Sequence, residues 1–148
     1  MFADNVIILE GEFPSQFGEG WPLIDETVST MREFGWSESE TFGVNLAIVE
    51  AVTNAIKHGN RNDRSKTYYL RVEVTPIQVR VMVRDEGDGF DCSLIRDPRK
   101  GENLEFPNGR GIFLMREYMS AVHFNRIGNE LMMVKNRTGA AGQHVCTN

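Results

Sequence analysis

The chain has 148 residues, of which 41% are hydrophobic, and this size and composition fit one compact domain with a buried core. Its 21 acidic and 16 basic side chains give a formal net charge of -5, which disfavours nucleic acid as a direct partner because phosphate backbones are bound by clustered Lys and Arg. Cys92 and Cys146 lack the spacing of a zinc site or a disulfide framework, so a reducing, cytoplasmic location is expected.

The sequence shows no signal for a membrane or for export. No apolar run approaches the roughly 18 residues that a membrane-spanning helix requires. Residues 1–11 include Asp4, Asn5 and Glu10 and lack a basic region, so they do not resemble a signal peptide. We therefore expect neither insertion nor secretion.

The first third of the chain predicts a strand followed by a helix. Residues 6–13 contain β-branched side chains in partial alternation, which favours a strand that stops at Pro14. Apolar residues then recur at helical spacing from Ile24 to Phe34, and Gly35 ends the pattern. This helix is expected to pack against the rest of the domain through its apolar face.

A second, longer helix is expected to begin after Ser37 and to end at Gly59. Ser37 and Glu40 have the spacing of a capping box, in which the Ser oxygen and the Glu carboxylate satisfy free backbone amides of the first turn. The apolar face of this helix is predicted from the residues that return to one side at about 100° per residue. These residues are Phe42, Leu46, Val49, Val52 and Ile56.

Period-two alternation begins at Thr67 and predicts two strands, over residues 67–75 and 77–84. Pro76 lies between them at a tight connection, so the strands are expected to pair as a hairpin that ends at Asp85.

The last third of the chain predicts a loop, a helix and a second hairpin. Residues 91–108 lose periodicity and collect Pro, Gly and charged residues, which is typical of a loop that acts as a lid. A helical stretch follows to Met119, and strands over 121–126 and 130–135 flank the turn signal at 128–129. These elements predict an α+β fold, a two-layer sandwich in which helices cover one face of a mixed, mostly antiparallel sheet.

The long helix carries a row of polar side chains that suits phosphate chemistry. Glu50, Asn54 and His58 are spaced four residues apart along one face, with Lys57 beside them. An amide oxygen can ligate Mg²⁺, while a neighbouring carboxylate orients or deprotonates a hydroxyl. A polar face directed at water is the alternative interpretation, and Lys57 and His58 also suit the negative end of the helix dipole.

The end of the first hairpin is a second candidate segment. Gly87 and Gly89 permit close approach of a ligand, and Asp85 can accept a hydrogen bond from an exocyclic amine. The alternative is an ordinary Asp-Gly turn that closes a strand. A calcium loop is disfavoured because Gly87 stands where that pattern requires an acid or an amide.

The third segment leads from Gly109 and Gly111 into a helix, whose free amides and positive dipole end suit a phosphate. Arg110 adds a cation. Leu114 occupies the place of the third glycine of a Rossmann fingerprint, and the GKS or GKT ending of a P-loop is absent. The alternative is a glycine-rich turn before a core helix.

In this order, the three segments resemble the ATP-binding motifs of the histidine-kinase-like ATPase superfamily. Residues 50–59 resemble its N box, residues 85–89 its first glycine box and residues 109–111 its second. The short chain and the Gly-Arg-Gly-Ile-Phe-Leu-Met run at 109–115 are similar to the bacterial anti-sigma-factor serine kinases, and the resemblance covers nearly the whole chain.

The resemblance implies a Bergerat-type pocket for ATP and Mg²⁺. In such a pocket Asp85 contacts adenine, Asn54 ligates Mg²⁺ and Glu50 is the candidate base. The remaining nucleotide contacts are assigned to Lys57, Gly87, Gly89, Gly109, Arg110, Gly111 and Ile112. Candidate cations for the terminal phosphate are Arg96, Arg99, Lys100 and Arg110.

The implied activity is that of an ATP-dependent protein serine/threonine kinase. It transfers the γ-phosphoryl group of ATP to a serine of an anti-sigma-factor antagonist, a STAS-type protein, and sequesters a sigma factor in addition. A homodimer is expected, with no direct role for nucleic acid or a membrane. The alternative is a non-catalytic regulator, in which bound nucleotide sets the shape of the lid and thereby the affinity for a protein partner.

Overall fold

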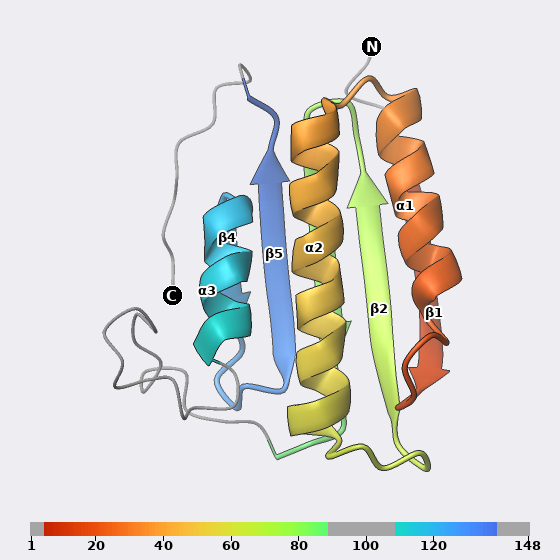
Figure 1. The fold of residues 1–148 in the computed structure, drawn as a ribbon, viewed down its shortest axis with the longest axis vertical. Helices are drawn as coiled ribbons and strands as arrows, with labels where there is room; N and C mark the ends of the chain where they lie inside the picture. The colour runs from red at the N-terminus through yellow and green to blue at the C-terminus, as the bar shows by residue number, and fades with distance from the viewer. Residues whose placement is uncertain (1–4, 89–108, 139–148) are drawn as a thin grey trace.

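The computed structural model describes residues 5–88 and 109–138, and its elements are shown in Figure 1. The predicted lid at 91–108 lies outside the described residues. The elements are β1 (Ile7–Pro14), α1 (Trp21–Glu33), α2 (Glu38–Asn54), the π-helix η2 (Ala55–Gly59), β2 (Thr67–Val74), β3 (Gln78–Arg84), α3 (Gly109–Tyr118), β4 (Ala121–Phe124) and β5 (Glu130–Asn136).

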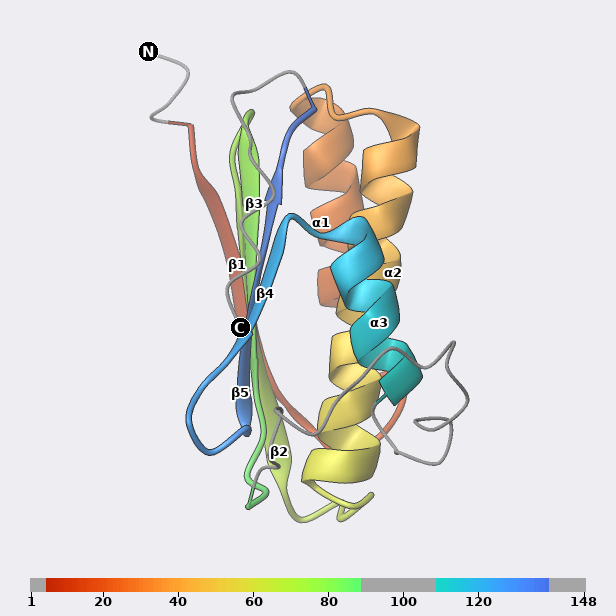
Figure 2. The same ribbon diagram turned by 90° about the vertical axis from the view of Figure 1, so that its left-hand side faces the viewer.

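Within the described residues, five strands form one sheet in the order β1-β2-β3-β5-β4, and each neighbouring pair is antiparallel. Figure 2 shows the sheet edge-on, with α1, α2 and α3 all on the same side of it. The predicted α+β class and its two layers are therefore confirmed. The helices of the described ranges are too short or too polar to cross a membrane.

The core lies between the sheet and the helix layer. In β2 the side chains of Tyr68, Leu70, Val72 and Val74 are buried, and in β3 those of Val79, Val81 and Val83. The two strands form the predicted hairpin, in which Val74 pairs with Val79. The predicted alternation is confirmed: the buried side chains of the two strands face the helices, which cover one face of the sheet.

The start of α2 forms half of the predicted capping box. The Ser37 hydroxyl accepts a hydrogen bond from the Glu40 amide at 3.1 Å and donates one to the Glu40 carboxylate at 2.9 Å. The other carboxylate oxygen of Glu40 accepts hydrogen bonds from the amide and the hydroxyl of Thr138, at 2.7 and 2.9 Å. Glu40 thus links the start of the helix to the chain that follows β5, a long-range contact that local spacing does not reveal.

The predicted apolar face of α2 is wrong in its N-terminal half. Phe42 is 59% exposed and packs edge-on against Tyr118 of α3, with ring centroids 6.2 Å apart. The side chains that fill the core here are smaller: Val44, Ala47, Ile48, Ala51 and Val52. The reason is that α2 lies against both the sheet and α3, and a Cβ at Gly43 would come within 2.9 Å of the Tyr118 ring. Close helix packing therefore selects small residues here.

Candidate functional site

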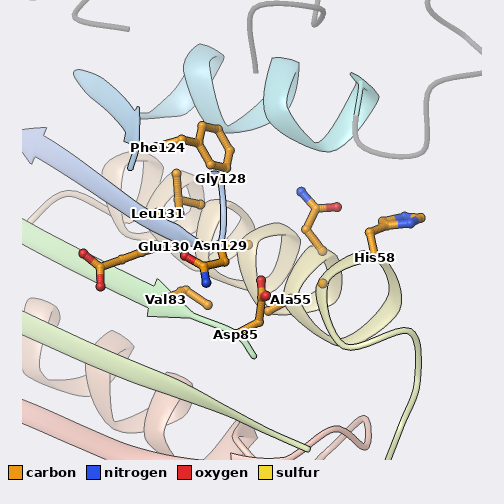
Figure 3. Close-up of a pocket in the computed structure, with 12 residues that line it drawn as sticks. Ala55, His58, Val83, Asp85, Phe124, Gly128, Asn129, Glu130 and Leu131 are labelled. Atoms are coloured by element: carbon orange, nitrogen blue, oxygen red, sulfur yellow. The ribbon is translucent and has the colours of Figure 1, made fainter. Parts of the chain in front are cut away.

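A pocket lies between the C-terminal end of the long helix and the ends of β3 and β5 (Figure 3). Its walls are largely apolar, with Val83, Phe124 and Leu131 from three strands and Ala51 and Ala55 from the helix. The remaining lining residues are Asn54, His58, Gly59, Asp85, Gly128, Asn129 and Glu130. An apolar slot with a few convergent polar groups suits a flat ring system with a polar edge.

Asp85 is the first residue after β3, and Figure 3 shows its carboxylate directed into the pocket. Its backbone amide donates to the Asn129 carbonyl at 2.9 Å, and its Oδ1 accepts from the Gly87 amide at 2.7 Å. Burial raises the pKa of the Asp85 carboxyl above its ordinary value, whereas the Gly87 hydrogen bond and the charge of Lys66 act in the opposite direction. The Asp85 carboxylate is thus an oriented hydrogen-bond acceptor in a partly desolvated pocket.

Two glycines make room for this carboxylate. A Cβ at Gly59 would overlap the carboxyl group of Asp85, and a Cβ at Gly87 would overlap the carbonyl group of Gly59. The sequence indicated Gly59 as a helix end and as part of the N-box run, but not as a partner of Asp85. Its role depends on the meeting of helix and sheet.

Asn54, which lines the pocket, lies next to the first turn of α3. A Cβ at Gly111 would lie 3.2 Å from Nδ2 of Asn54 and 3.2 Å from Oε1 of Glu50. Asn54 therefore stands between the Asp85 pocket and the N-terminal end of α3, with Glu50 beside it. The side chains of Glu50 and Asn54 form no hydrogen bond or ion pair with another residue of the described ranges.

The helix changes its geometry at this point. Asn54 is the last residue of α2, and residues 55–59 form a π-helix that closes with a hydrogen bond from the Asn60 amide to the Ala55 carbonyl at 2.8 Å. Short π-helical segments inside helices often occur at functional sites. The sequence predicted an uninterrupted helix up to Gly59, because the wider turn leaves no signature in residue spacing.

His58 and Lys57 lie at the margin of the site. His58 lines the pocket, but its ring points away from Asp85 in Figure 3. Burial, and then the charge of Lys57, lower the pKa of the His58 imidazole. Lys57 is exposed and outside the pocket lining, with its ammonium 5.9 Å from the centre of the Phe17 ring.

The other predicted ligand residues fall into two groups. Gly109 and Arg110 begin α3, and the Ile112 side chain is fully buried in the core, so any ligand contact of Ile112 falls to its backbone. Gly89 and the loop cations Arg96, Arg99 and Lys100 lie outside the described residues.

The pocket also contains a residue to which the sequence gave no site role. Asn129 was predicted as part of a hairpin turn, yet it lines the pocket and its Nδ2 donates to the Gly87 carbonyl at 3.3 Å. The Gly-Asn pair signals the turn, whereas the proximity of this turn to Asp85 follows from the pairing of β3 with β5.

The described residues offer few ligands of their own to a metal ion. Within residues 5–88 and 109–138, no group of three or more His, Cys, Asp and Glu side chains is arranged to hold a metal ion. A Mg²⁺ ion beside Asn54 would therefore need most of its oxygen ligands from phosphates and water, which is the usual manner of Mg²⁺ binding in kinases.

The helix layer over an antiparallel sheet defines a two-layer α+β domain. The family described as the histidine kinase-like ATPase domain matches residues 22–135, and the chain belongs to this family.

Several curated proteins named serine-protein kinase RsbW are similar to the chain. That of Bacillus subtilis (strain 168) is 28% identical over 152 residues, which cover 97% of this chain and 94% of the relative. That of Bacillus licheniformis is 29% identical over 99 residues, 61% of this chain and 60% of the relative. That of Staphylococcus aureus (strain MSSA476) is 33% identical over 84 residues, 52% and 53% of the two chains. The predicted family is confirmed, and the predicted class of enzyme agrees with the names of these relatives.

Proposed function

We propose that this chain binds ATP with Mg²⁺ and phosphorylates a serine of a protein substrate. The observation that carries the proposal is the position of Gly111, which brings the first turn of α3 against Asn54 and Glu50 on the flank of the Asp85 pocket. Asp85 as an acceptor for adenine, Asn54 as an amide ligand for Mg²⁺ and the N-terminus of α3 for the phosphates thus lie next to one another. The names of the RsbW relatives support serine as the acceptor residue.

The adenine ring is assigned to the apolar slot. Asp85 accepts a hydrogen bond from the exocyclic amine of adenine, and Val83, Phe124 and Leu131 contact the ring. The approach of the ring depends on Gly87 and, in the predicted motif, on Gly89. Because guanine has a carbonyl oxygen where adenine has this amine, the carboxylate of Asp85 disfavours guanine.

The phosphates extend from this slot past Asn54 toward α3. The free amides of the first turn, from Gly109 to Ile112, bind phosphate oxygens, and Arg110 and Lys57 are the proposed cations. Lys57 would exchange its contact with Phe17 for the phosphates. Asn54 provides the amide oxygen for Mg²⁺, which supplies neutralisation of the charge on the phosphates when it is bound.

Glu50 is the proposed base. Its carboxylate accepts the proton of the substrate serine while the serine oxygen forms a bond to the γ-phosphorus, and the bond from that phosphorus to the bridging oxygen of ADP breaks. The products are phosphoserine and ADP. Positioning and charge stabilisation supply most of the acceleration in this type of reaction, so Glu50 contributes a part of it.

We take the proposed protein partners from the resemblance of the sequence to the anti-sigma regulatory kinases. The substrate is a STAS-type antagonist, the second partner is a sigma factor that the chain sequesters, and the chain forms a homodimer in the cytoplasm. One domain over residues 1–148, including a lid at 91–108, carries these activities.

Phosphoryl transfer to STAS-type antagonists tests the proposal. The protein is incubated with γ-labelled ATP, Mg²⁺ and a panel of such antagonists, each beside a variant that lacks its acceptor serine. We expect labelled phosphoserine with the wild type. With Glu50→Gln the rate should fall by a factor of at least about 10², since general bases contribute factors of this size. Glu33→Gln, at the exposed end of α1, is the matched control and retains the wild-type rate.

Two results would reject parts of this proposal. A wild-type rate with Glu50→Gln would remove Glu50 as the base. ATP binding that alters the affinity for a protein partner, without transfer to any antagonist, would favour the non-catalytic regulator instead.

A further inference from the structure

Asn60 is a buried polar side chain close to the pocket, although it does not line the pocket itself. It is 1% exposed and lies directly after the π-helix. Its Nδ2 donates to the Ser15 hydroxyl at 2.7 Å and to the Thr67 carbonyl at 2.8 Å, and its Oδ1 accepts from the Glu86 amide at 2.8 Å. Both donor hydrogens of the side-chain amide are therefore in use, together with one acceptor site.

The bond to Glu86 acts on the pocket through the backbone. The Glu86 amide belongs to the peptide unit that joins Asp85 to Glu86, so the bond from Asn60 fixes the plane of that unit. The next amide, of Gly87, donates to the carboxylate of Asp85. A rotation of the first peptide unit would move this donor and, with it, the direction in which the carboxylate points.

Asn129 forms hydrogen bonds to the same loop. Its carbonyl accepts from the Asp85 amide at 2.9 Å, and its Nδ2 donates to the Gly87 carbonyl at 3.3 Å. Asn60 supplies the 2.8 Å bond to the central residue, Glu86, and is anchored in turn to Ser15 and Thr67. The loop is thus held by two asparagines, one directly after η2 and one directly before β5.

The local backbone does not account for an asparagine at position 60. Asparagine is frequent after helices because it tolerates a left-handed conformation. Asn60, however, has a φ of -89° and a ψ of -4°, which most residues adopt readily, whereas Arg61 and Asn62 have the positive φ values. The hydrogen bonds of its side chain, and not its backbone conformation, therefore explain why position 60 is an asparagine.

We infer that Asn60 is a positioning residue for adenine recognition: it holds the loop of residues 85–87 so that the Asp85 carboxylate faces the adenine amine. This inference rests on the proposed function. Its consequence is selectivity, because a carboxylate free to turn away loses contact with adenine and no longer disfavours guanine. Loss of Asn60 should therefore weaken ADP binding more than GDP binding.

The test is calorimetric titration of the full chain with Mg-ADP and with Mg-GDP, using the wild type, Asn60→Ala and Asn60→Asp. It is performed at a temperature at which near-ultraviolet circular dichroism shows each variant to be folded. The control is Thr27→Ala in α1, because Thr27 is fully buried and its hydroxyl bonds within its own helix, to the Leu23 carbonyl at 3.0 Å. This control lowers the melting temperature without contact to the pocket.

For Asn60→Ala we expect ADP affinity about tenfold lower and a reduced ratio of ADP to GDP affinity, since the partly buried Glu86 amide loses its acceptor. Asn60→Asp retains an oxygen for the Glu86 amide and restores part of this ratio. Thr27→Ala leaves the ratio unchanged.

An unchanged ratio in Asn60→Ala would overturn the inference and leave Asn60 as a purely structural residue. Should Asn60→Ala not fold, Asn60→Asp alone decides: we expect a ratio closer to the wild type than to unity, and a ratio of unity would overturn the inference. Failure of the wild type to bind ADP at all would instead reject the proposed function, and the inference with it.

Discussion

Gly59 and Asp85 meet where the helix layer joins the sheet, and the carboxyl group of Asp85 occupies the space that a side chain at position 59 would need. Gly59 is the last residue of η2, and Asp85 directly follows β3. The absence of a side chain at Gly59 is thus a condition for the acceptor in the pocket to point as it does in Figure 3.

We predict that Gly59→Ala destabilises the protein and weakens nucleotide binding. Helix propensity alone would make alanine more favourable by about 1 kcal/mol. The overlap with Asp85 opposes this gain with a cost of about 1–3 kcal/mol, typical of an overpacked site. Urea unfolding of the single variants and of the double variant with Asp85→Ala measures the coupling. If Gly59→Ala lowered the unfolding free energy equally in the Asp85→Ala background, overlap with the Asp85 carboxyl group would not be the cause.

Gly111→Ala should separate stability from catalysis. The new Cβ would lie 3.2 Å from Asn54 and from Glu50, a contact that small shifts of these side chains can relieve. Since alanine is the better helix former, we expect an unchanged or slightly raised melting temperature. Displacement of Asn54 and Glu50 lowers kcat for phosphoryl transfer, on the order of tenfold or more. Melting curves and transfer rates of the same preparations check both parts, and a wild-type kcat would refute the proposed placement.

The raised pKa of Asp85 predicts how stability depends on pH. A proton on Asp85 binds more tightly in the folded state, so this residue contributes stability below its ordinary pKa of 3.8 and loses that contribution as pH rises through the higher folded value. The unfolding free energy of the wild type, relative to Asp85→Asn, should therefore fall as pH increases from about 4 and then become constant.

Urea unfolding of the two proteins without nucleotide, in parallel at each pH, measures this difference because other titrating groups cancel. A relative gain of the wild type with rising pH would show that its carboxylate is stabilised by its surroundings, contrary to the expected effect of burial.

Arg137 should matter for stability without affecting the nucleotide site. Its guanidinium donates to the carbonyls of Phe34, Gly35 and Pro76 and lies over the Trp36 ring, 5.6 Å from the centroid. We expect Arg137→Ala to lower the unfolding free energy by about 2–4 kcal/mol, because several charge-assisted bonds are lost together.

Arg137→Lys keeps the charge but not the planar fork, so it should recover only part of this loss. Chemical unfolding and ADP titration of both variants check the prediction. A loss of ADP affinity in the folded Arg137→Ala protein would contradict the expectation that Arg137 affects stability alone.

The sequence was sufficient to predict those features that depend on neighbours along the chain. The alternation in β2 and β3 reports which face of a strand is buried, and Ser37 caps α2 as predicted because an N-cap bond is local. The grouping of Glu50 with Asn54 follows from helical spacing and is retained in the structure.

Features that depend on contacts between distant segments were not predictable in this way. Phe42 is exposed although it is large and apolar, because α3 packs against the small residues of α2. The positions of Asn60 and Asn129 around the Asp85 loop arise from the junction of helix, hairpin and turn. In the sequence alone, Asn60 and Asn129 are typical loop residues.

The central claim is that the Asp85 pocket binds ATP, and calorimetric titration of the wild type and Asp85→Asn with ATP and Mg²⁺ tests it most directly. We predict binding to the wild type and an affinity about tenfold to a hundredfold lower for Asp85→Asn, which exchanges a charged acceptor for a neutral one. Equal affinities, or no binding to the wild type, would contradict the assignment of this pocket to the nucleotide.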